Sequence, residues 1–223
     1  MCKEIYFLVL TNPSIYKVRF STGLFLLLML TYYLFYKPYL VLSQFTSQEG
    51  KQTLADYVSV PKDVYPVGRL DHDSEGLLIL TNDAQLNHRL LNPDHKHVRE
   101  YWVQVEGNIT ATALNELSKG VIISIDGKQH KTLPATAKLF TTEPSLPERN
   151  PPIRFRKNIP TSWISLALTE GKNRQVRRMT AKVGFPTLRL IRYRIENITL
   201  QQMQPGDLVE LSKQEIYKGL FKQ

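Results

Sequence analysis

Cysteine is nearly absent from this chain of 223 residues, in which Cys2 is the only one. A single thiol cannot form an intramolecular disulfide or build a zinc site of clustered cysteines. The chain has no internal repeat and no low-complexity tract, which argues against solenoid and disordered proteins. With 42% hydrophobic residues, 11 tyrosines and 9 phenylalanines, it can bury a core of ordinary size. The composition predicts a globular protein of one domain or two small lobes.

No uncharged apolar run is long enough to predict a membrane-spanning helix. Residues 23–36 form a run of 14 residues without a charge, whereas a spanning helix needs about 20. The run has the length of a signal-peptide core, but bulky Tyr32, Tyr33 and Phe35 stand where a small-residue cleavage site would follow. Its aromatic second half ends at Lys37-Pro38 and predicts a strand. We expect residues 1–30 to be an apolar, disordered or loosely packed extension without stable membrane association.

Negative charge is almost missing from residues 149–194. This stretch contains twelve basic residues and one acid, Glu170, whereas the rest of the chain carries 17 basic and 19 acidic residues. Such a run is often no more than a solvated surface. Here it is interleaved with Trp163, Phe185 and Tyr193, a mixture that suits phosphates and stacked bases. The net charge of +9 therefore favours a nucleic acid as the partner.

Short apolar segments separated by turn residues predict many strands and few helices. We expect a proline-rich extended loop over residues 143–160. The predicted strands lie within residues 32–38, 39–45, 65–68, 77–81, 101–107, 121–127, 136–140, 162–169, 188–200 and 206–212. The predicted helices lie within residues 50–58, 84–92, 110–120 and 174–184. This pattern indicates an α+β fold that is largely antiparallel.

Three carboxylates, those of Asp71, Asp73 and Glu75, crowd one short loop between two apolar strands. Their spacing imitates the first half of an EF-hand, but the twelfth position is Asn82 where a bidentate glutamate is needed. A glycosidase with paired carboxylates fits a basic chain poorly. An aspartate nucleophile remains open, because a carboxylate near Arg69 at a strand end can stay ionised and attack an electrophilic carbon. The pattern alone slightly favours a turn whose acids only cap or meet solvent.

The same loop carries a family resemblance. GRLDHDSEGLLILTNDAQL, from Gly68, resembles the central motif of pseudouridine synthases of the RsuA/RluB/RluE/RluF group. Lys37-Pro38 resembles the opening motif of that group, REYWVQVEG its motif strand, and EGKNRQVRRMTAKVGFPTLRLIRYRI its long basic motif. The resemblance covers residues 33–212, about four fifths of the chain. NPPIRFRKNIPTSW, and the lack of an S4-type domain in front, most resemble the branch that acts on large-subunit (23S) rRNA.

The resemblance implies the pseudouridine synthase fold, a mixed and mostly antiparallel sheet in two lobes with a few flanking helices. The active-site cleft is expected between the lobes. We therefore divide the chain into the extension 1–30, a catalytic domain over 31–215 and a C-terminal tail over 216–223. The extension is not part of the family pattern, and a start at Met29 is one hypothesis for it, which N-terminal sequencing would decide.

Members of this group convert a uridine in RNA to pseudouridine by breaking the N-glycosidic bond, rotating the base and rejoining it through carbon. The resemblance implies an enzyme without cofactor or metal, a cytoplasmic monomer that acts on free or partly assembled 23S rRNA. A non-catalytic RNA-binding or ribosome-assembly protein on the same fold is the alternative. A membrane-attached protein is a third interpretation, which rests on residues 23–36 alone.

The resemblance also assigns roles to single residues. Asp71 matches the essential aspartate, whether it attacks the base, attacks the sugar or promotes a glycal route. Tyr101 matches the tyrosine that stacks on the flipped uracil, and Arg177 the arginine that pairs with the aspartate. Arg69 matches the arginine that fills the space left by the flipped base, offsetting part of a cost of a few kcal/mol. Leu190 matches a position that packs against the pocket, although a plain core leucine explains it equally well.

The remaining candidates for RNA binding are basic side chains. Each of them alone is as well explained as an ordinary surface charge, but together they predict binding that depends strongly on salt. They are Lys37, Arg154, Arg156, Lys157, Lys172, Arg174 and Arg178.

Overall fold

The computed structural model describes residues 6–11, 14–19, 29–153 and 159–221. Three of the predicted RNA contacts, Arg154, Arg156 and Lys157, lie outside the described residues. So does the first part of the apolar run, residues 23–28. Within the described ranges, no helix is both long and apolar enough to cross a membrane.

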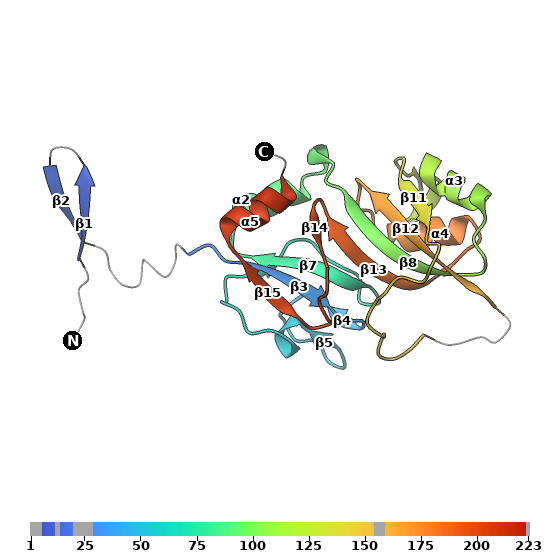
Figure 1. Ribbon diagram of the computed structural model, residues 1–223, viewed down its shortest axis with the longest axis horizontal. Helices are drawn as coiled ribbons and strands as arrows, with labels where there is room; N and C mark the ends of the chain where they lie inside the picture. Colours follow the sequence, from blue (N-terminus) through green and yellow to red (C-terminus); the bar gives the residue numbers. More distant parts are fainter. Residues whose placement is uncertain (1–5, 12–13, 20–28, 154–158, 222–223) are drawn as a thin grey trace.

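A nine-stranded sheet runs through the molecule (Figure 1). Its central strands follow the order β11-β12-β8-β13-β7-β3-β15, with β14 paired to β13 and β6 paired to β7. β13 and β7 pair in parallel, and the other described pairs of this sheet are antiparallel. The prediction of a mixed, mostly antiparallel sheet is therefore confirmed. Its strands are β3 (Tyr32–Lys37), β6 (Tyr65–Pro66), β7 (Glu75–Thr81), β8 (Arg99–Glu106), β11 (Thr136–Leu139), β12 (Thr161–Leu168), β13 (Thr187–Ile195), β14 (Ile198–Thr199) and β15 (Leu208–Leu211).

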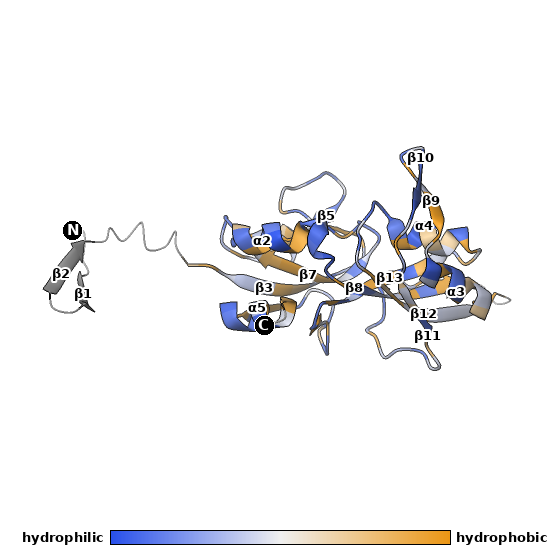
Figure 2. Ribbon diagram, turned by 90° about the horizontal axis from the view of Figure 1, so that it is seen from above, coloured by the Kyte–Doolittle hydropathy of each residue, from blue (hydrophilic) through white to orange (hydrophobic). Residues whose placement is uncertain are grey.

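Three two-stranded sheets and a small set of helices complete the described fold. The small sheets are β1 (Tyr6–Thr11) with β2 (Ser14–Arg19), β4 (Val41–Leu42) with β5 (Gln52–Thr53), and β9 (Ile122–Ile125) with β10 (Lys128–Lys131). The α-helices are α2 (Ala84–Leu91), α3 (Ala111–Lys119), α4 (Gln175–Lys182) and α5 (Lys213–Leu220). Two 3-10 turns are η2 (Leu54–Asp56) and η3 (Pro93–His95). Figure 2 shows α2 and α5 at one end of the sheet and α3, α4 and the β9–β10 hairpin at the other.

Some boundaries differ from the prediction. The strand expected over residues 39–45 shortens to β4, and the helix expected over 50–58 shortens to η2. The hairpin of β1 and β2 within the extension was not predicted. The predicted boundary between the catalytic domain, which ends at residue 215, and a C-terminal tail over 216–223 is also wrong, because it falls inside α5.

Helix α5 has a clear start signal that the sequence analysis overlooked. Ser212 and Glu215 form a capping box, in which the Ser212 hydroxyl accepts from the Glu215 amide and the Glu215 carboxylate accepts from the Ser212 amide. One turn apart, Ile216 and Leu220 are buried in the core. The Tyr217 hydroxyl donates to the Asp83 carboxylate at 2.8 Å. These contacts fix α5 against the start of α2.

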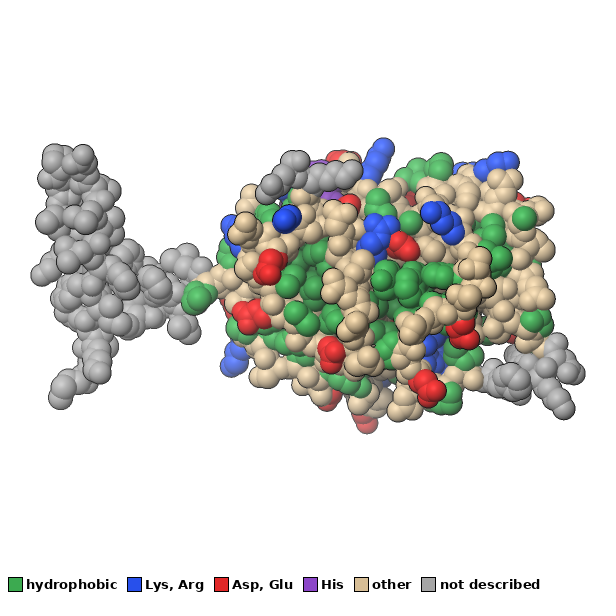
Figure 3. All heavy atoms as spheres, viewed as in Figure 1, with side chains coloured by type: hydrophobic (Ala, Val, Ile, Leu, Met, Phe, Trp, Pro, Cys, Tyr) green, Lys and Arg blue, Asp and Glu red, His purple; other side chains and the backbone are tan. Residues whose placement is uncertain are grey.

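The sheet divides the core into clusters on its two faces. The central strand β7 is covered on both faces, so its sequence does not alternate between apolar and polar residues. All seven of its residues are buried. Leu77 and Ile79 pack with α2 and α5, while Leu78 and Leu80 pack on the opposite face with Val41 and other residues near β4. A third cluster joins β8 and β12 to α3 and α4. On the face seen in Figure 3, hydrophobic side chains gather over the middle and basic ones are scattered.

The two halves of the sheet, β11-β12-β8-β13 and β7-β3-β15, are joined where β7 pairs in parallel with β13. Gly76 has a φ of +111° and lies so close to β13 that a Cβ atom there would be 2.4 Å from the Arg192 carbonyl oxygen. Beside it, Arg189 binds the Glu75 carboxylate twice, at 2.9 and 2.8 Å, with both side chains buried. The close approach of the backbone at Gly76 and the buried ion pair of Arg189 with Glu75 therefore hold β7 and β13 together at this junction.

Replacing Gly76 by alanine should destabilise the fold by at least about 2 kcal/mol, because strain in φ and a backbone clash add together. The free energy of unfolding in urea measures this loss. Gly127→Ala is the matched control, since Gly127 also has a positive φ, +79°, but a Cβ atom added there would have nothing within 4 Å. Equal losses in the two variants would contradict the close approach at Gly76.

Candidate active site

A large cleft opens where the loop between β6 and β7 meets the start of α4. Its volume is about 1080 Å³. The lining comes from residues 67–72 and Ser74, from the segment around 90–97, from β8 and β13, and from the segment 168–176 that leads into α4. The cleft therefore draws on both ends of the sheet, and among the predicted site residues it contains Arg69, Asp71, Tyr101, Lys172, Arg174 and Leu190.

The loop that carries Asp71 is held in place by hydrogen bonds to Ser43 and by one within the loop itself. The Ser43 hydroxyl donates to the Leu70 carbonyl at 2.9 Å and accepts from the Leu70 amide at 3.0 Å. The Ser74 amide donates to the Asp71 carbonyl at 3.0 Å, which closes a turn. The Asp71 side chain is 32% exposed. A fixed backbone thus presents this carboxylate to the cleft.

Lys37 is a structural residue, so its predicted role in binding RNA is wrong. The side chain is fully buried. Its ammonium donates to the carbonyls of Pro38 at 2.9 Å and Val41 at 2.6 Å, with a longer contact to His72 at 3.5 Å. Burial lowers the pKa of Lys37 to about 7, against the opposing effect of Glu75. The lysine ties the end of β3 to the loop of Asp71 from inside the protein.

The lowered pKa of Lys37 makes stability depend on pH. Between pH 7 and about 10 the unfolded chain binds more protons at this lysine than the folded chain, because its pKa rises to the ordinary 10.5 on unfolding. The stability of the wild type should therefore rise relative to Lys37→Met, by up to about 1.4 kcal/mol per pH unit. Urea denaturation of both proteins at pH 6.5, 8 and 9.5 measures the difference. A constant difference would contradict the lowered pKa of Lys37.

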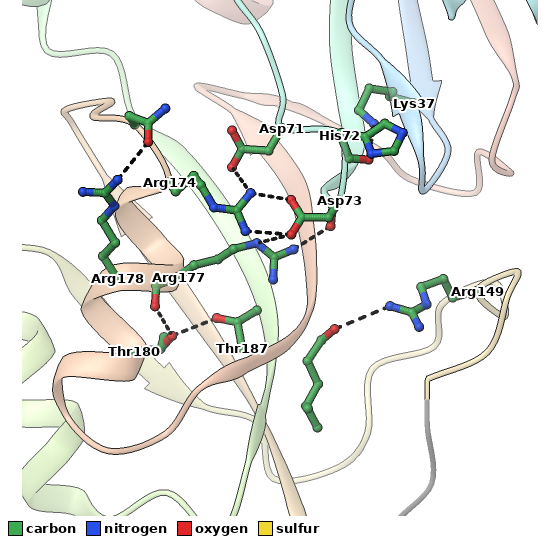
Figure 4. Close-up of polar contacts among 12 residues, drawn as sticks. Lys37, Asp71, His72, Asp73, Arg149, Arg174, Arg177, Arg178, Thr180 and Thr187 are labelled. Atoms are coloured by element: carbon green, nitrogen blue, oxygen red, sulfur yellow. Dashed lines mark hydrogen bonds and ion pairs between the residues drawn. The ribbon is translucent and has the colours of Figure 1, made fainter. Parts of the chain in front are cut away.

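Two arginines from α4 meet the carboxylates of the loop (Figure 4). Arg174 binds Asp73 through both terminal nitrogens at 2.8 Å and lies 3.8 Å from the Asp71 carboxylate. The Arg177 Nε lies 3.4 Å from the Asp73 carboxylate, and its Nη2 donates to the Asp73 carbonyl at 2.5 Å. The predicted pairing of Arg177 with Asp71 is therefore wrong. Arg177 pairs with Asp73, and Arg174 is the nearer cation to Asp71.

Local geometry explains this arrangement. Arg174 is the N-cap of α4 and has a left-handed backbone, with a φ of +50°, which turns its side chain toward the loop. Arg177 follows three residues later and therefore lies on the same side of the helix. Burial raises the pKa of Asp73, but hydrogen bonds from Arg174 and the charge of Arg177 together hold it below its ordinary value. Asp73 is thus charged at neutral pH.

Tyr101 and Leu190 form the apolar part of the cleft. Tyr101 is half-buried on β8, and its strand partner across the sheet is Arg192 of β13. Leu190 is buried in the cluster of β8, β12 and α4 and also lines the cleft. Leu190 is therefore both a core leucine and a residue that lines the cleft.

Arg192 also lines the cleft, and the sequence analysis did not identify it. Its side chain is buried, and its Nε donates to the Leu77 carbonyl at 2.8 Å. Its Nη2 has no hydrogen-bond partner within the described ranges. Its position two residues after Leu190 was a usable signal, because side chains two apart on a strand share a face. Asp73 was noticed as a carboxylate, but no role was given to it.

The other basic candidates differ in their surroundings. Arg69 and Lys172 are exposed at the cleft. Arg178 points away from Asp71 and binds the Ser124 carbonyl of β9 and the Asn173 side chain. Its guanidinium thereby connects α4 to the β9–β10 hairpin. Across the part of the chain that the structure describes, no cluster of histidine, cysteine or acidic side chains is placed to hold a metal ion.

The chain belongs to the RNA pseudouridylate synthase family, since the model of that family matches residues 31–182. A crystal structure of a pseudouridylate synthase has the same fold, with a TM-score of 0.70 and 23% identity over 86% of this chain and 74% of the other. The expected fold is thereby confirmed.

Curated relatives narrow the comparison. Ribosomal large subunit pseudouridine synthase E of Vibrio vulnificus is 53% identical over 179 residues, which cover 80% of this chain and 74% of the relative. The protein of the same name from Xanthomonas campestris is 51% identical over 76% of this chain and 89% of its own length. Ribosomal large subunit pseudouridine synthase B of Bacillus subtilis is 33% identical over 83% of this chain and 69% of the relative.

Proposed function

We propose that this chain isomerises a uridine of large-subunit (23S) ribosomal RNA to pseudouridine, with Asp71 as the essential carboxylate. The observation that carries the proposal is the position of Asp71. It lies in the cleft with no hydrogen bond to its carboxylate from any described residue, and the nearest cation, Arg174, is 3.8 Å away. The names of the curated relatives supply the substrate class.

The chemistry requires no reactant beyond the RNA. The bond from N1 of uracil to C1′ of ribose breaks and a bond from C5 to C1′ forms, while C5 loses a proton and N1 gains one. Attack on the base, attack on the sugar and proton abstraction toward a glycal all need an ionised carboxylate close to C1′. Asp71 supplies such a carboxylate on a fixed loop, with the charge of Arg174 nearby. We infer an enzyme without cofactor or metal for the same reason.

The base must leave its stack to reach Asp71. We assign Tyr101 as the side chain on which the flipped uracil stacks, with Leu190 beneath the same pocket, because both line the cleft. Arg69 is exposed at the cleft, where its guanidinium can enter the space that the base leaves. Arg174 and Lys172 are placed for the RNA backbone, so binding should weaken as salt rises.

We further infer a cytoplasmic monomer that acts on free or partly assembled rRNA. A non-catalytic RNA-binding protein on the same fold would not need the carboxylate of Asp71 in the same cleft as Tyr101. No observation favours that alternative.

Asp71→Asn should abolish turnover while RNA affinity changes by less than about threefold, because the amide keeps the shape but cannot act as an anion. Single-turnover kinetics on a 23S rRNA fragment and filter binding measure the two quantities. Retained turnover in this variant would remove Asp71 from the mechanism.

The substrate is tested by mapping pseudouridines in cells with and without the gene, by carbodiimide labelling and primer extension. One site should disappear from 23S rRNA and return with the wild-type chain but not with Asp71→Asn. If no ribosomal site disappears, the proposed substrate is wrong and tRNA is the next RNA to map.

Arg69→Gln should slow the reaction more on a duplex target than on a target uridine in an unstacked loop, with a difference of about tenfold. The reason is that the arginine is needed only where the base must be extracted from a stack. Comparing kcat/KM for the two RNAs measures the effect, with the exposed Lys119→Gln as the control for loss of one surface charge. An equal loss on both RNAs would instead indicate a phosphate contact.

A further inference from the structure

Arg192 is a buried cation that has no acidic partner among the described residues. Its side chain is only 4% exposed. Its Nε donates to the Leu77 carbonyl at 2.8 Å, whereas its Nη2 is buried and meets no acceptor in the described ranges. Across the part of the chain that the structure describes, no carboxylate forms an ion pair with it. Because a buried donor left unpaired costs about 1–3 kcal/mol, this guanidinium points to an acceptor from outside the chain.

The guanidinium lies beside the pocket that we assign to the flipped uracil. Arg192 is paired directly with Tyr101 across β8 and β13, so the two side chains project to the same face of the sheet. Leu190, two residues earlier on β13, shares that face. All three side chains line the cleft. Burial lowers the pKa of Arg192, the nearby Tyr101 side chain opposes this effect, and the charge of Arg99 adds to it.

We propose that Arg192 is a further catalytic residue, whose guanidinium donates to a carbonyl oxygen of the flipped uracil and stabilises the negative charge that this oxygen gains. The inference rests on the proposed function, because it requires the uracil to stack on Tyr101. A phosphate is the less suitable ligand for Arg192. Lys172 and Arg174 are exposed cations of the same cleft and are open to the RNA backbone, whereas Arg192 is buried below the surface.

The charge reaches a carbonyl oxygen on each of the routes left open for Asp71. When the bond from N1 to C1′ breaks, its electron pair stays on the base and spreads from N1 to O2 and O4. When the carboxylate first adds to C6, the electron pair of the C5–C6 double bond moves toward O4. In each case C5 then bonds to C1′ and loses its proton, while N1 gains one. A donor fixed before the reaction, as Arg192 is by Leu77, stabilises such an anion by about 10²–10³ in rate.

Two substitutions at Arg192 separate its charge from its packing, since Arg192→Gln removes the charge and Arg192→Lys keeps it. At saturating RNA we expect the single-turnover rate constant to fall about 100-fold with glutamine and less with lysine. The Kd for RNA should change by less than about threefold, because the contact strengthens only as the charge develops. Arg194→Gln is the matched control, since Arg194 also lies on β13 but binds Glu100 and does not line the cleft.

The control should react within about twofold of the wild type. The proposal is overturned if Arg192→Gln does the same, if Arg192→Lys loses as much rate as Arg192→Gln, or if the lost rate is matched by lost RNA affinity.

Sulfur in place of a carbonyl oxygen tests for direct contact, because sulfur is a weak hydrogen-bond acceptor. The wild type and Arg192→Gln are compared on RNAs with uridine, 2-thiouridine or 4-thiouridine at the target position. For one of the two thio RNAs, the rate ratio of wild type to variant should shrink from about 100 to below about 10, since the intrinsic reactivity of the base cancels in the ratio. Undiminished ratios for both RNAs contradict the contact.

The same substitution in a Tyr101→Phe background removes an alternative explanation. Arg192→Gln should reduce the rate by as large a factor there as in the wild type. If the reduction disappears, Arg192 acts only through the Tyr101 hydroxyl and the proposed contact with the base is wrong.

A measurement that leaves Arg192 unchanged covers variants that fail to fold. In Asp71→Asn bound to RNA, the nitrogen NMR signals of the Arg192 guanidinium should differ between RNA with the target uridine and the same RNA with an abasic target nucleotide. Identical signals overturn the proposal. Turnover by the wild type and by Asp71→Asn is measured alongside. An inactive Asp71→Asn with a fully active Arg192→Gln rejects this inference alone, whereas an active Asp71→Asn rejects the proposed function itself.

Discussion

The buried ion pair between Glu75 and Arg189 is the constraint on which the cleft depends. It lies at the parallel junction of β7 and β13, where Gly76 lets the two backbones approach. Removing one partner of such a pair costs about 3–5 kcal/mol, because it leaves the other charge buried alone. Asp71 and Asp73 lie four and two residues before Glu75, so the ion pair of Glu75 fixes the end of the loop that carries both aspartates. The loop that carries Asp71 thus ends at this ion pair and close approach of β7 and β13.

The basic stretch of the sequence is divided between surface and interior. Residues 149–194 predicted a nucleic-acid partner, and Lys172 and Arg174 are exposed at the cleft. Arg189 and Arg192 are buried and serve the sheet, and Arg177 is largely enclosed beside Asp73. A count of charges therefore overestimates the surface offered to phosphates. It also underestimates how much of the internal structure depends on arginine.

Periodicity and turn residues predicted much of the fold, whereas contacts between distant residues were beyond their reach. The strand predicted at residues 77–81 and the helix predicted at 84–92 correspond to β7 and α2. The capping box at Ser212 was readable but overlooked, and the resemblance predicted the cleft and the positions of Tyr101 and Leu190. The burial of Lys37 and the partner of Arg177 depend on how loops pack against β3 and α4. No local pattern contains that information.

The anchoring of the Asp71 loop by Lys37 also has a consequence for how the protein responds to a rise in pH through about 7. A lysine ammonium has three N–H donors and can satisfy three carbonyls at once, whereas the neutral amine has two donors and a lone pair. When the proton leaves, one of the carbonyls of Pro38, Val41 and His72 faces that lone pair and is repelled. The loop that carries Asp71 is therefore coupled to the proton concentration of the solution by a side chain that is buried inside the protein.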